Sequence, residues 1–301
     1  MSKVGENMRF AAGITLYNPE IDRLKKNLDT CFFQVETVFL VDNGSGNISE
    51  IKELLKHYEN TKLIENKENL GIAKALNQLC DNASLNGFKW ILLLDQDSFV
   101  EDGIIESYSR YIEIERVALL TPLFDDENEP KIIESEARVP YEPVNRAITS
   151  ASFIRLDVWK SVGGFDEDMF IDCVDFDYCT TLLEKGFVIL RDNETLVHHR
   201  LGHSKEIKFF IPFGRIFGIK SLKKPLYTYN HSPWRTYYYA RNIKYYCFKH
   251  KDFINSWSER LSFIKWFVLK IGFEDQKFKK LWAIIKGRRD AKQMIKNLKL
   301  K

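Results

Sequence analysis

Short runs of apolar residues, each ending in polar residues, recur along the first third of the chain. Such runs are typical of parallel strands that are buried on both faces. Between them lie polar turn residues and apolar residues with helical spacing, such as Leu24 and Leu28. Strands that alternate with helices predict an α/β, Rossmann-like fold with a mainly parallel sheet. The predicted strands are residues 10–17, 35–41, 62–65 and 90–94, and helices are predicted over residues 49–57 and from residue 69 onward.

Polar side chains mark the ends of three of these strands. Thr15 and Tyr17 close the first strand, Asp42 follows the second, and two aspartates, Asp95 and Asp97, follow the fourth. Because open α/β sheets bind ligands outside the carboxyl ends of their strands, we expect these side chains to meet in one crevice. A packed tyrosine, a turn-capping aspartate and an acidic loop are the structural alternatives.

The chemistry of these side chains suits a nucleoside diphosphate. A tyrosine ring can stack on a base, and a carboxylate such as Asp42 can accept an imide N–H. In an extended chain Asp95 and Asp97 lie on the same side, so both can serve one Mg²⁺ or Mn²⁺ that holds the diphosphate. The sequence contains no glycine-rich phosphate loop of the dinucleotide or ATP type.

The last third of the chain differs from the rest in charge. Residues 200–301 carry 25 Lys and Arg against 6 Asp and Glu, whereas residues 1–199 carry 20 against 36. No apolar run there is long enough to span a bilayer, but aromatic and basic residues alternate, as in residues 261–270, which favours helices on an anionic membrane surface. Packing on the first domain or an oligomer contact is the alternative. We predict a domain of residues 1–205 and a basic, aromatic, mostly helical extension of residues 206–301.

Several classes of protein are disfavoured. Nucleic acid is not expected as a partner, because the front of the chain is acidic and holds no known nucleic-acid-binding module. The five cysteines form no C-x-x-C pair, which gives little support to a disulfide framework or a zinc site. Residues 1–7 are polar and the next apolar stretch has only the length of a strand, so we expect no signal peptide and a cytoplasmic protein.

Four motifs follow one another at the predicted strand ends and at the start of a helix: TLYNP at 15–19, VDNGS at 41–45, NLGIA at 69–73 and LDQDS at 94–98. Together they resemble the inverting family 2 glycosyltransferases of the GT-A fold, most of all the bacterial rhamnosyltransferases. The resemblance covers residues 9–245. It implies that Asp42 reads the base, Asp95 binds the ribose and Asp97 binds the metal. Further residues of the implied donor site are Thr15, Tyr17, Asn69 and Lys74.

A second block of motifs resembles the acceptor and catalytic-base region of that family. The segment GGFDE at 163–167 leads into MFIDCVDFDY at 169–178. An inverting transfer needs a base that takes a proton from the acceptor hydroxyl, and Asp175 matches the family's base. Asp172 and Asp177 remain alternatives. Asp177 shares the side of Asp175 in an extended segment, whereas a helix that begins near Asp175 turns it away.

The chain departs from the family pattern at two points. Val174 stands where many relatives have an acid, and Thr180–Thr181 stand where an arginine is common. Both changes weaken the prediction of the acceptor. Neither touches the expected base or metal ligand, so activity remains the prediction.

The resemblance also assigns residues further along the chain. His199 opens an H-x-x-G motif and is the implied histidine ligand of the metal, with His198 as the second choice. Because ligation needs neutral imidazole, metal binding should weaken as the pH falls below the mid-sixes. Arg241 resembles a family residue that contacts donor or acceptor phosphates. An arginine at the membrane surface is the alternative.

The predicted function is metal-dependent, inverting glycosyl transfer. The resemblance implies dTDP-L-rhamnose as the donor and a growing bacterial surface glycan, linked to polyprenyl diphosphate, as the acceptor. Such an acceptor would place the protein at the cytoplasmic face of the cell membrane. The rivals are a UDP-hexose transferase (galactose, glucose or N-acetylhexosamine) of the same fold, a non-catalytic nucleotide- or glycan-binding module, and an adaptor that uses the basic tail.

Overall fold

The computed structural model describes residues 8–126, 139–199 and 205–300. The chain divides into two compact units that are interleaved in sequence. Unit 1 comprises residues 1–170 and 174–200, and unit 2 comprises residues 171–173 and 201–301. The chain therefore enters unit 2 for three residues, returns to unit 1, and leaves it again after residue 200.

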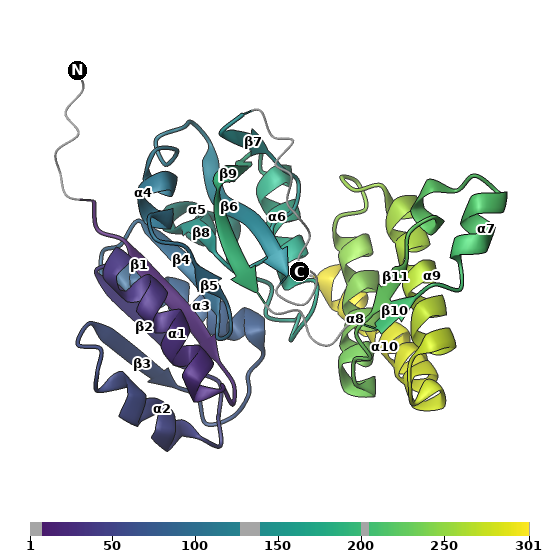
Figure 1. Cartoon of the computed structure of the whole chain (residues 1–301), viewed down its shortest axis with the longest axis horizontal. Coiled ribbons are helices and arrows are strands. Elements are labelled where there is room, and N and C mark those ends of the chain that lie inside the picture. Colours follow the sequence, from purple (N-terminus) through teal and green to yellow (C-terminus); the bar gives the residue numbers. More distant parts are fainter. Residues whose placement is uncertain (1–7, 127–138, 200–204, 301) are drawn as a thin grey trace. The chain divides into compact units, whose positions relative to one another are not determined.

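Unit 1 is built on a nine-stranded sheet with the order β3-β2-β1-β4-β8-β6-β9-β5, in which β7 also pairs with β9 (Figure 1). The first four strands of this order are parallel to one another. The predicted α/β fold class is thereby confirmed. The strands are β1 (Ala11–Leu16), β2 (Thr37–Asp42), β3 (Thr61–Glu65), β4 (Trp90–Asp95), β5 (Phe99–Val100), β6 (Val117–Asp126), β7 (Tyr141–Pro143), β8 (Ser152–Arg155) and β9 (Val188–His199).

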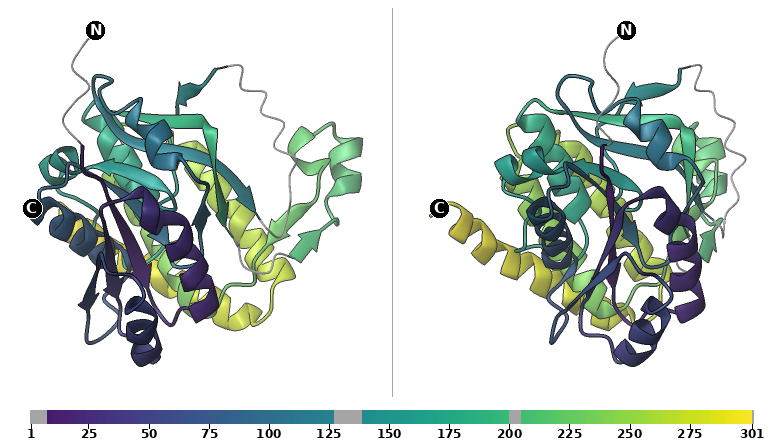
Figure 2. Two further views of the ribbon diagram at one scale, coloured as in Figure 1. Left: turned by 60° about the vertical axis from the view of Figure 1, so that its left-hand side comes forward. Right: turned by 90° about the vertical axis from the view of Figure 1, so that its left-hand side faces the viewer.

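Helices cover both faces of the parallel half of this sheet. The helices of unit 1 are α1 (Ile21–Cys31), the 3-10 helix η1 (Phe32–Gln34), α2 (Ile48–Leu55), α3 (Ile72–Leu85), α4 (Ile104–Ser109), α5 (Leu156–Val162) and α6 (Val174–Glu184). On one face Ile14 of β1 joins a core cluster with Leu24 and Leu28 of α1. On the other face a Cβ at Gly13 would lie 3.2 Å from Leu79 of α3, so this helix packs closely on the strand. Figure 2 (right) shows α1 and α3 on opposite sides of the strands. Since both faces are covered, the strands are apolar throughout.

The other half of the sheet is mixed. Strand β8 runs antiparallel between β4 and β6, β5 and β7 run antiparallel to β9, and β6 and β9 are parallel. These pairings were not predicted from the sequence, because several of the strands are very short and the β6–β9 register shifts twice. Strand β9 runs from Val188 to His199 and carries the histidine segment at its end.

Unit 2 is mainly helical, as predicted for the C-terminal region. Helix α10 packs along α8. None of the described helices is long and apolar enough to cross a membrane. The elements are the antiparallel strands β10 (Lys205–Ile207) and β11 (Leu226–Thr228), α7 (Ile211–Ile216), the 3-10 helix η2 (Lys220–Leu222), α8 (Pro233–Lys249), α9 (Ser256–Phe273) and α10 (Lys277–Leu298).

A cluster of charged side chains is buried inside unit 2. Glu274 accepts hydrogen bonds from Lys270 Nζ (2.7 Å) and from Lys280 Nζ (2.8 Å). It also accepts the Thr228 hydroxyl and the Asn230 backbone N–H, the latter at 3.1 Å. Burial lowers the pKa of Lys270, and the hydrogen bond to Glu274 opposes this shift. Buried charges are tolerated when they are paired and hydrogen-bonded, so this cluster ties β11 to α9 and α10.

Candidate functional site

The ends of β1, β2 and β4 lie side by side in unit 1. In the parallel register Thr15 pairs with Asp95 on β4, and its neighbour Leu16 pairs with Asp42 on β2. Three of the residues predicted from the strand ends therefore stand on adjacent strands at one edge of the sheet. This edge is the carboxyl end of the parallel strands, where α/β sheets bind ligands.

Asp42 carries a carboxylate oxygen with no partner. Its Oδ2 accepts the backbone N–H groups of Gly44 (3.2 Å) and Ser45 (3.0 Å) and so closes the turn after β2. Asp42 is 2% exposed, and its Oδ1 is buried without a hydrogen-bond partner among the described residues. Leaving a buried acceptor unpaired costs about 1–3 kcal/mol. A ligand that donates a hydrogen bond to this oxygen would remove that cost.

Tyr17 follows directly after β1 and is half exposed. Its backbone N–H donates to Oε1 of Gln96 at 2.8 Å, and Nε2 of Gln96 donates to the Tyr17 carbonyl at 3.4 Å. Gln96, the middle residue of the D-x-D motif, thus joins the end of β1 to the end of β4. The sequence pattern gave Gln96 no role of its own.

Two side chains of α1 anchor the turn that carries the D-x-D motif. Nδ2 of Asn27 donates to the carbonyl of Asp95 at 2.6 Å, and Nη2 of Arg23 donates to the carbonyl of Asp97 at 3.1 Å. These bonds fix the backbone from which both carboxylates extend. Neither Asn27 nor Arg23 was predicted, because each acts on a turn about seventy positions further along the chain.

Asn69 shapes the loop that leads into α3. Its Oδ1 accepts the N–H of Gly71 (2.9 Å) and Nδ2 of Asn43 (3.2 Å). Gly71 has a φ of +89°, and a Cβ there would lie 2.7 Å from the carbonyl oxygen of Phe170. Only glycine fits this close approach. The structure therefore gives Asn69 a role in the loop, and its predicted role in donor binding stays a prediction.

Lys74 lies on the first turn of α3. Its Nζ is 3.1 Å from Oε2 of Glu167, and both side chains are about two-fifths exposed. Glu167 also accepts a hydrogen bond from Nδ2 of Asn77 at 2.9 Å. Exposed ion pairs contribute little to stability, so Lys74 can exchange this partner for a phosphate at small cost.

The histidine segment lies on β9, between β5 and β6. His198 pairs with Phe99 of β5 and with Asp125 of β6. Its Nδ1 is 3.2 Å from Oδ2 of Asp125, and its Nε2 is 3.8 Å from Oε1 of Glu101. Neither carboxylate was predicted, because neither belongs to a motif. His199 ends β9, but its side chain lies outside the described residues.

Strand β5 therefore connects the turn that carries the Asp97 carboxylate with the strand that carries the His198 imidazole. The turn that carries Asp97 leads directly into β5, and β5 pairs with the strand of His198. Carboxylates suit Mg²⁺ and Mn²⁺, and imidazole is a common metal ligand, so the chemistry of these groups fits a divalent cation. Among the side chains that the structure describes, which do not include that of His199, no three His, Cys, Asp or Glu residues form a metal-binding group.

Asp175 is the second residue of α6 and is half-buried. Its Oδ1 accepts the N–H of Phe176 at 2.9 Å. Because α6 begins at Val174, the segment is helical, and the buried Asp177 is turned away from Asp175. The hydroxyls of Thr180–Thr181, which replace the family's arginine, bond back to carbonyls of the same helix at 2.8 and 2.9 Å.

Asp172, another alternative for the base, belongs to unit 2. Arg235 of α8 donates to its Oδ1 from Nε (3.1 Å) and Nη2 (3.0 Å). Asn242 of α8 donates to the carbonyls of Ile171 (2.7 Å) and Asp172 (3.0 Å). Asp172 and Cys173 have φ angles of +64° and +65°, which residues other than glycine rarely adopt. Burial raises the pKa of Asp172, and the Arg235 charge opposes this shift.

Arg241 lies on the same helix. Its guanidinium is 4.7 Å from the ring centre of Tyr238, and its Nε donates to Oδ1 of Asn242 at 2.9 Å. This hydrogen bond orients the amide whose nitrogen holds residues 171–173. The structure thus connects Arg241 with the support of that segment, and its predicted contact with phosphate stays a prediction.

Comparison with known proteins matches residues 12–158 to the family described as glycosyl transferase family 2. These residues include the ends of β1, β2 and β4, but not Asp175 or the histidine segment. The dTDP-rhamnosyl transferase RfbF of Shigella flexneri is 28% identical over 251 residues, which are 78% of this chain and 79% of that protein.

Solved structures share the fold. The mannosyltransferase PcManGT from Pyrobaculum calidifontis, in complex with GDP-Man and Mn²⁺, matches with a TM-score of 0.57 and 13% identity over 94% of this chain and 73% of that one. GalNAc-T7 with UDP, GalNAc and Mn²⁺ matches with a TM-score of 0.54 and 14% identity over 80% of this chain. The match spans only 51% of GalNAc-T7. At these identities the likeness concerns the fold, and it confirms the predicted GT-A fold.

Proposed function

Because this chain is a glycosyltransferase with a family 2 domain, we propose that it transfers L-rhamnose from dTDP-L-rhamnose, with inversion at the anomeric carbon. The similarity to dTDP-rhamnosyl transferase RfbF supports this donor. The structural neighbour in complex with GDP-Man and Mn²⁺ supports a nucleotide-sugar pocket and a divalent metal.

The observation that carries the proposal is the buried Oδ1 of Asp42, which has no partner among the described residues. Thymine carries an imide N–H that can donate to this oxygen. Tyr17 follows the adjacent strand and presents a half-exposed ring on which a base can stack. Uracil carries the same imide, so a UDP-sugar is the rival donor.

We assign the diphosphate side of the pocket to the turn after β4. Asp95 binds the ribose, and Asp97 would hold Mg²⁺ or Mn²⁺ together with His199 or, as the second choice, His198. When bound, such a metal neutralises the charge that develops on the departing diphosphate. The remaining donor contacts are assigned to Thr15, Asn69, Lys74 and Arg241.

Asp175 is the proposed catalytic base. Its carboxylate accepts the proton of the acceptor hydroxyl while that oxygen attacks the anomeric carbon, and the bond from this carbon to the diphosphate oxygen breaks on the opposite face. No covalent bond between sugar and protein forms. Asp177 is buried and Asp172 is held by Arg235, so both are less suited to this role.

We propose a growing surface glycan on a polyprenyl diphosphate as the acceptor. Residues 1–205 would then form the catalytic domain, and residues 206–301 would contact the inner face of the cell membrane or a second copy of the chain. The excess of basic residues after position 200 supports this assignment. So do Trp257 and Trp282, whose side chains are largely exposed.

The proposal is tested by measuring release of nucleoside diphosphate, with and without Mn²⁺ or Mg²⁺, from dTDP-L-rhamnose and from a panel of UDP- and GDP-sugars. Slow hydrolysis makes an acceptor unnecessary. We expect metal-dependent release from dTDP-L-rhamnose, and loss of metal-dependent donor binding in Asp97→Ala. Selective release from a UDP-sugar would replace the donor but keep the mechanism. Absence of both release and metal-dependent binding for every donor would overturn the proposed function.

A further inference from the structure

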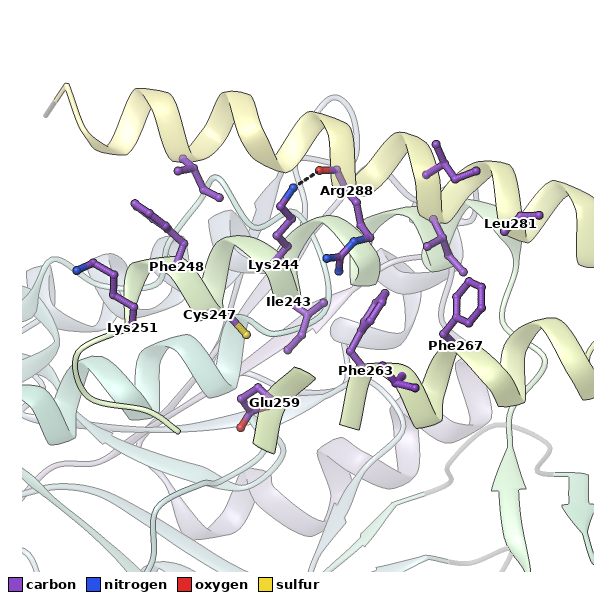
Figure 3. Close-up of a pocket in the computed structure, with 14 residues that line it drawn as sticks. Ile243, Lys244, Cys247, Phe248, Lys251, Glu259, Phe263, Phe267, Leu281 and Arg288 are labelled. Carbon is purple, nitrogen blue, oxygen red and sulfur yellow. Dashed lines mark hydrogen bonds between the residues drawn. The ribbon is translucent and has the colours of Figure 1, made fainter. Parts of the chain in front are cut away.

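An apolar groove of about 910 Å³ runs between the three long helices of unit 2 (Figure 3). Ile243 and Cys247 of α8 line it, Phe263 and Phe267 of α9 lie opposite, and Leu281 belongs to its α10 wall. A volume of this size is within the range of pockets that bury small ligands of mainly apolar character. All the residues that line the groove belong to unit 2.

The rim of this groove is basic. Lys244, Lys251 and Arg288 line it together with one carboxylate, Glu259, and Nζ of Lys251 already pairs with the neighbouring Asp252 at 3.0 Å. Nζ of Lys244 donates to the backbone carbonyl of Arg288 at 2.7 Å, and the Arg288 guanidinium is 4.7 Å from the ring centre of Phe263. Burial, with the charges of Arg288 and Lys292, lowers the pKa of Lys244. An anion at this rim would offset that repulsion.

We propose that this groove binds the isoprenoid chain of a phosphate-bearing lipid, with the chain between α8, α9 and α10 and the phosphate against Lys244 and Arg288. The two parts of the groove match the two parts of such a molecule: apolar walls bury the chain, and a cationic rim pairs with the phosphate. The inference rests on the proposed lipid-linked acceptor and names the site that holds its lipid.

A flat bilayer surface or a second copy of the chain fits these observations less well. A bilayer would be contacted by the exposed apolar side chains outside the groove, such as Leu261 and Trp282, and would leave the groove itself unfilled. A second copy would bring another strongly basic surface to a basic rim. A single chain with an anionic end complements both the shape and the charge.

Cys247 provides a probe inside the groove. The other four cysteines are buried, whereas Cys247 is partly exposed and lines the groove. We would measure the rate of its modification by N-ethylmaleimide, mapped by mass spectrometry, with farnesyl diphosphate as the lipid. Pyrophosphate and farnesol serve as head-only and chain-only controls. We expect farnesyl diphosphate to slow the reaction about tenfold at about ten times its Kd, and each control to protect far less.

Matched variants separate the groove from the surface around it. Ile264 and Leu261 are both exposed on α9, but only Ile264 lines the groove. Ile264→Asp should abolish protection by farnesyl diphosphate, and Leu261→Asp should retain it. Arg288→Glu should weaken binding about ten- to hundredfold, whereas Arg289→Glu, at an exposed neighbouring position outside the groove, should change it little.

Several results would overturn the inference. Equal loss in Ile264→Asp and Leu261→Asp, together with equal protection by phosphatidylglycerol vesicles, would indicate a bilayer-binding surface. Protection that grows with protein concentration in the absence of lipid would indicate a second copy in the groove. Release of nucleoside diphosphate is measured on the same variants. Protection without any release would reject the proposed transfer and support the groove as a lipid site. Release without protection would support the transfer and reject the groove as a lipid site.

Discussion

Asp42 in unit 1 and Glu274 in unit 2 are almost equally buried, at 2% and 3% exposed, but their partners differ. One oxygen of Asp42 has no hydrogen-bond partner among the described residues. Glu274 accepts hydrogen bonds from a hydroxyl, a backbone N–H and two lysines. The carboxylate at the sheet edge is left incomplete, whereas the carboxylate between the helices is fully satisfied.

This difference agrees with the proposed role of Asp42 in binding a ligand, and it indicates a structural role for Glu274. A buried acceptor without a partner lowers stability by about 1–3 kcal/mol, so a protein retains it only where the rest of the structure tolerates the loss. A buried charge with several partners stabilises one arrangement of the elements that supply them. Substitutions in unit 1 should therefore change activity or affinity, and substitutions in the unit 2 cluster should change stability.

The largest effect is expected for Asp175→Asn. The amide cannot take the acceptor proton, so transfer should fall by at least about a hundredfold, the low end for general base catalysis. Donor affinity and the free energy of unfolding should stay close to those of the unchanged protein. Initial rates with a glycan acceptor, donor titration and urea denaturation measure the three quantities. Asp81→Asn, an exposed carboxylate on α3, is the control, and unchanged transfer in Asp175→Asn would remove Asp175 from the mechanism.

Glu274→Ala should have the next largest effect, but on stability. It leaves Lys270 and Lys280 buried without their carboxylate, and breaking buried pairs in this way costs about 3–5 kcal/mol. Urea denaturation gives the difference, with Asp252→Ala, whose side chain is 88% exposed, as the control. A loss below about 1 kcal/mol, the level of surface pairs, would mean that the cluster does not hold unit 2 together.

Asp42→Asn probes the incomplete carboxylate directly. One side-chain oxygen remains for the turn, but an amide nitrogen faces the imide N–H of the base. Affinity for dTDP should fall about five- to 150-fold, corresponding to about 1–3 kcal/mol, while stability should stay the same or rise. Isothermal titration calorimetry and urea denaturation measure both, with the exposed Asp22→Asn as the control. A loss of stability with unchanged dTDP affinity would assign Asp42 to the fold alone.

Among these variants, His231→Phe in unit 2 is expected to have the smallest effect near neutral pH, where it should change the free energy of unfolding little. Burial, followed by the charges of Arg235, Lys270 and Lys280, lowers the pKa of His231 to about 3. The imidazole is therefore neutral in the folded protein, and protonation below about 6.5 favours the unfolded chain. The free energy of unfolding should decrease as the pH falls from about 6.5 towards 3, and His231→Phe should make this decrease shallower. Urea denaturation at pH 7, 6, 5 and 4 tests this, and identical slopes for both proteins would contradict it.

The parallel half of the sheet was predictable because its strands are buried on both faces and therefore read as unbroken apolar runs. The antiparallel half was not, since strands as short as Phe99–Val100 carry no period of their own. The same contrast holds for the site. Asp42, Asp95 and Asp97 follow strands and belong to motifs, but the bonds from Asn27 to the turn after β4 depend on tertiary contact alone.

The buried cluster of unit 2 is a second case in which tertiary contacts could not be predicted from the sequence. Lys270 and Glu274 are four positions apart, which in a sequence describes an ordinary pair on an exposed helix face. Burial of that pair, and the second lysine from α10, arise only when the helices assemble. Local spacing can indicate a pair within one turn of a helix, but not the side chains from other elements that complete the cluster.

The three residues 171–173 have a practical consequence for anyone who wishes to shorten this protein. They precede residue 205, yet Arg235 and Asn242, which bind the Asp172 carboxylate and the carbonyl groups of residues 171 and 172, are encoded more than sixty codons later. A stop codon after residue 205 would remove both side chains. Asp172 and Cys173 have positive φ angles, and the segment that contains them would then lose these hydrogen bonds. The two halves of this gene are therefore poor candidates for separate expression or for exchange with those of a relative.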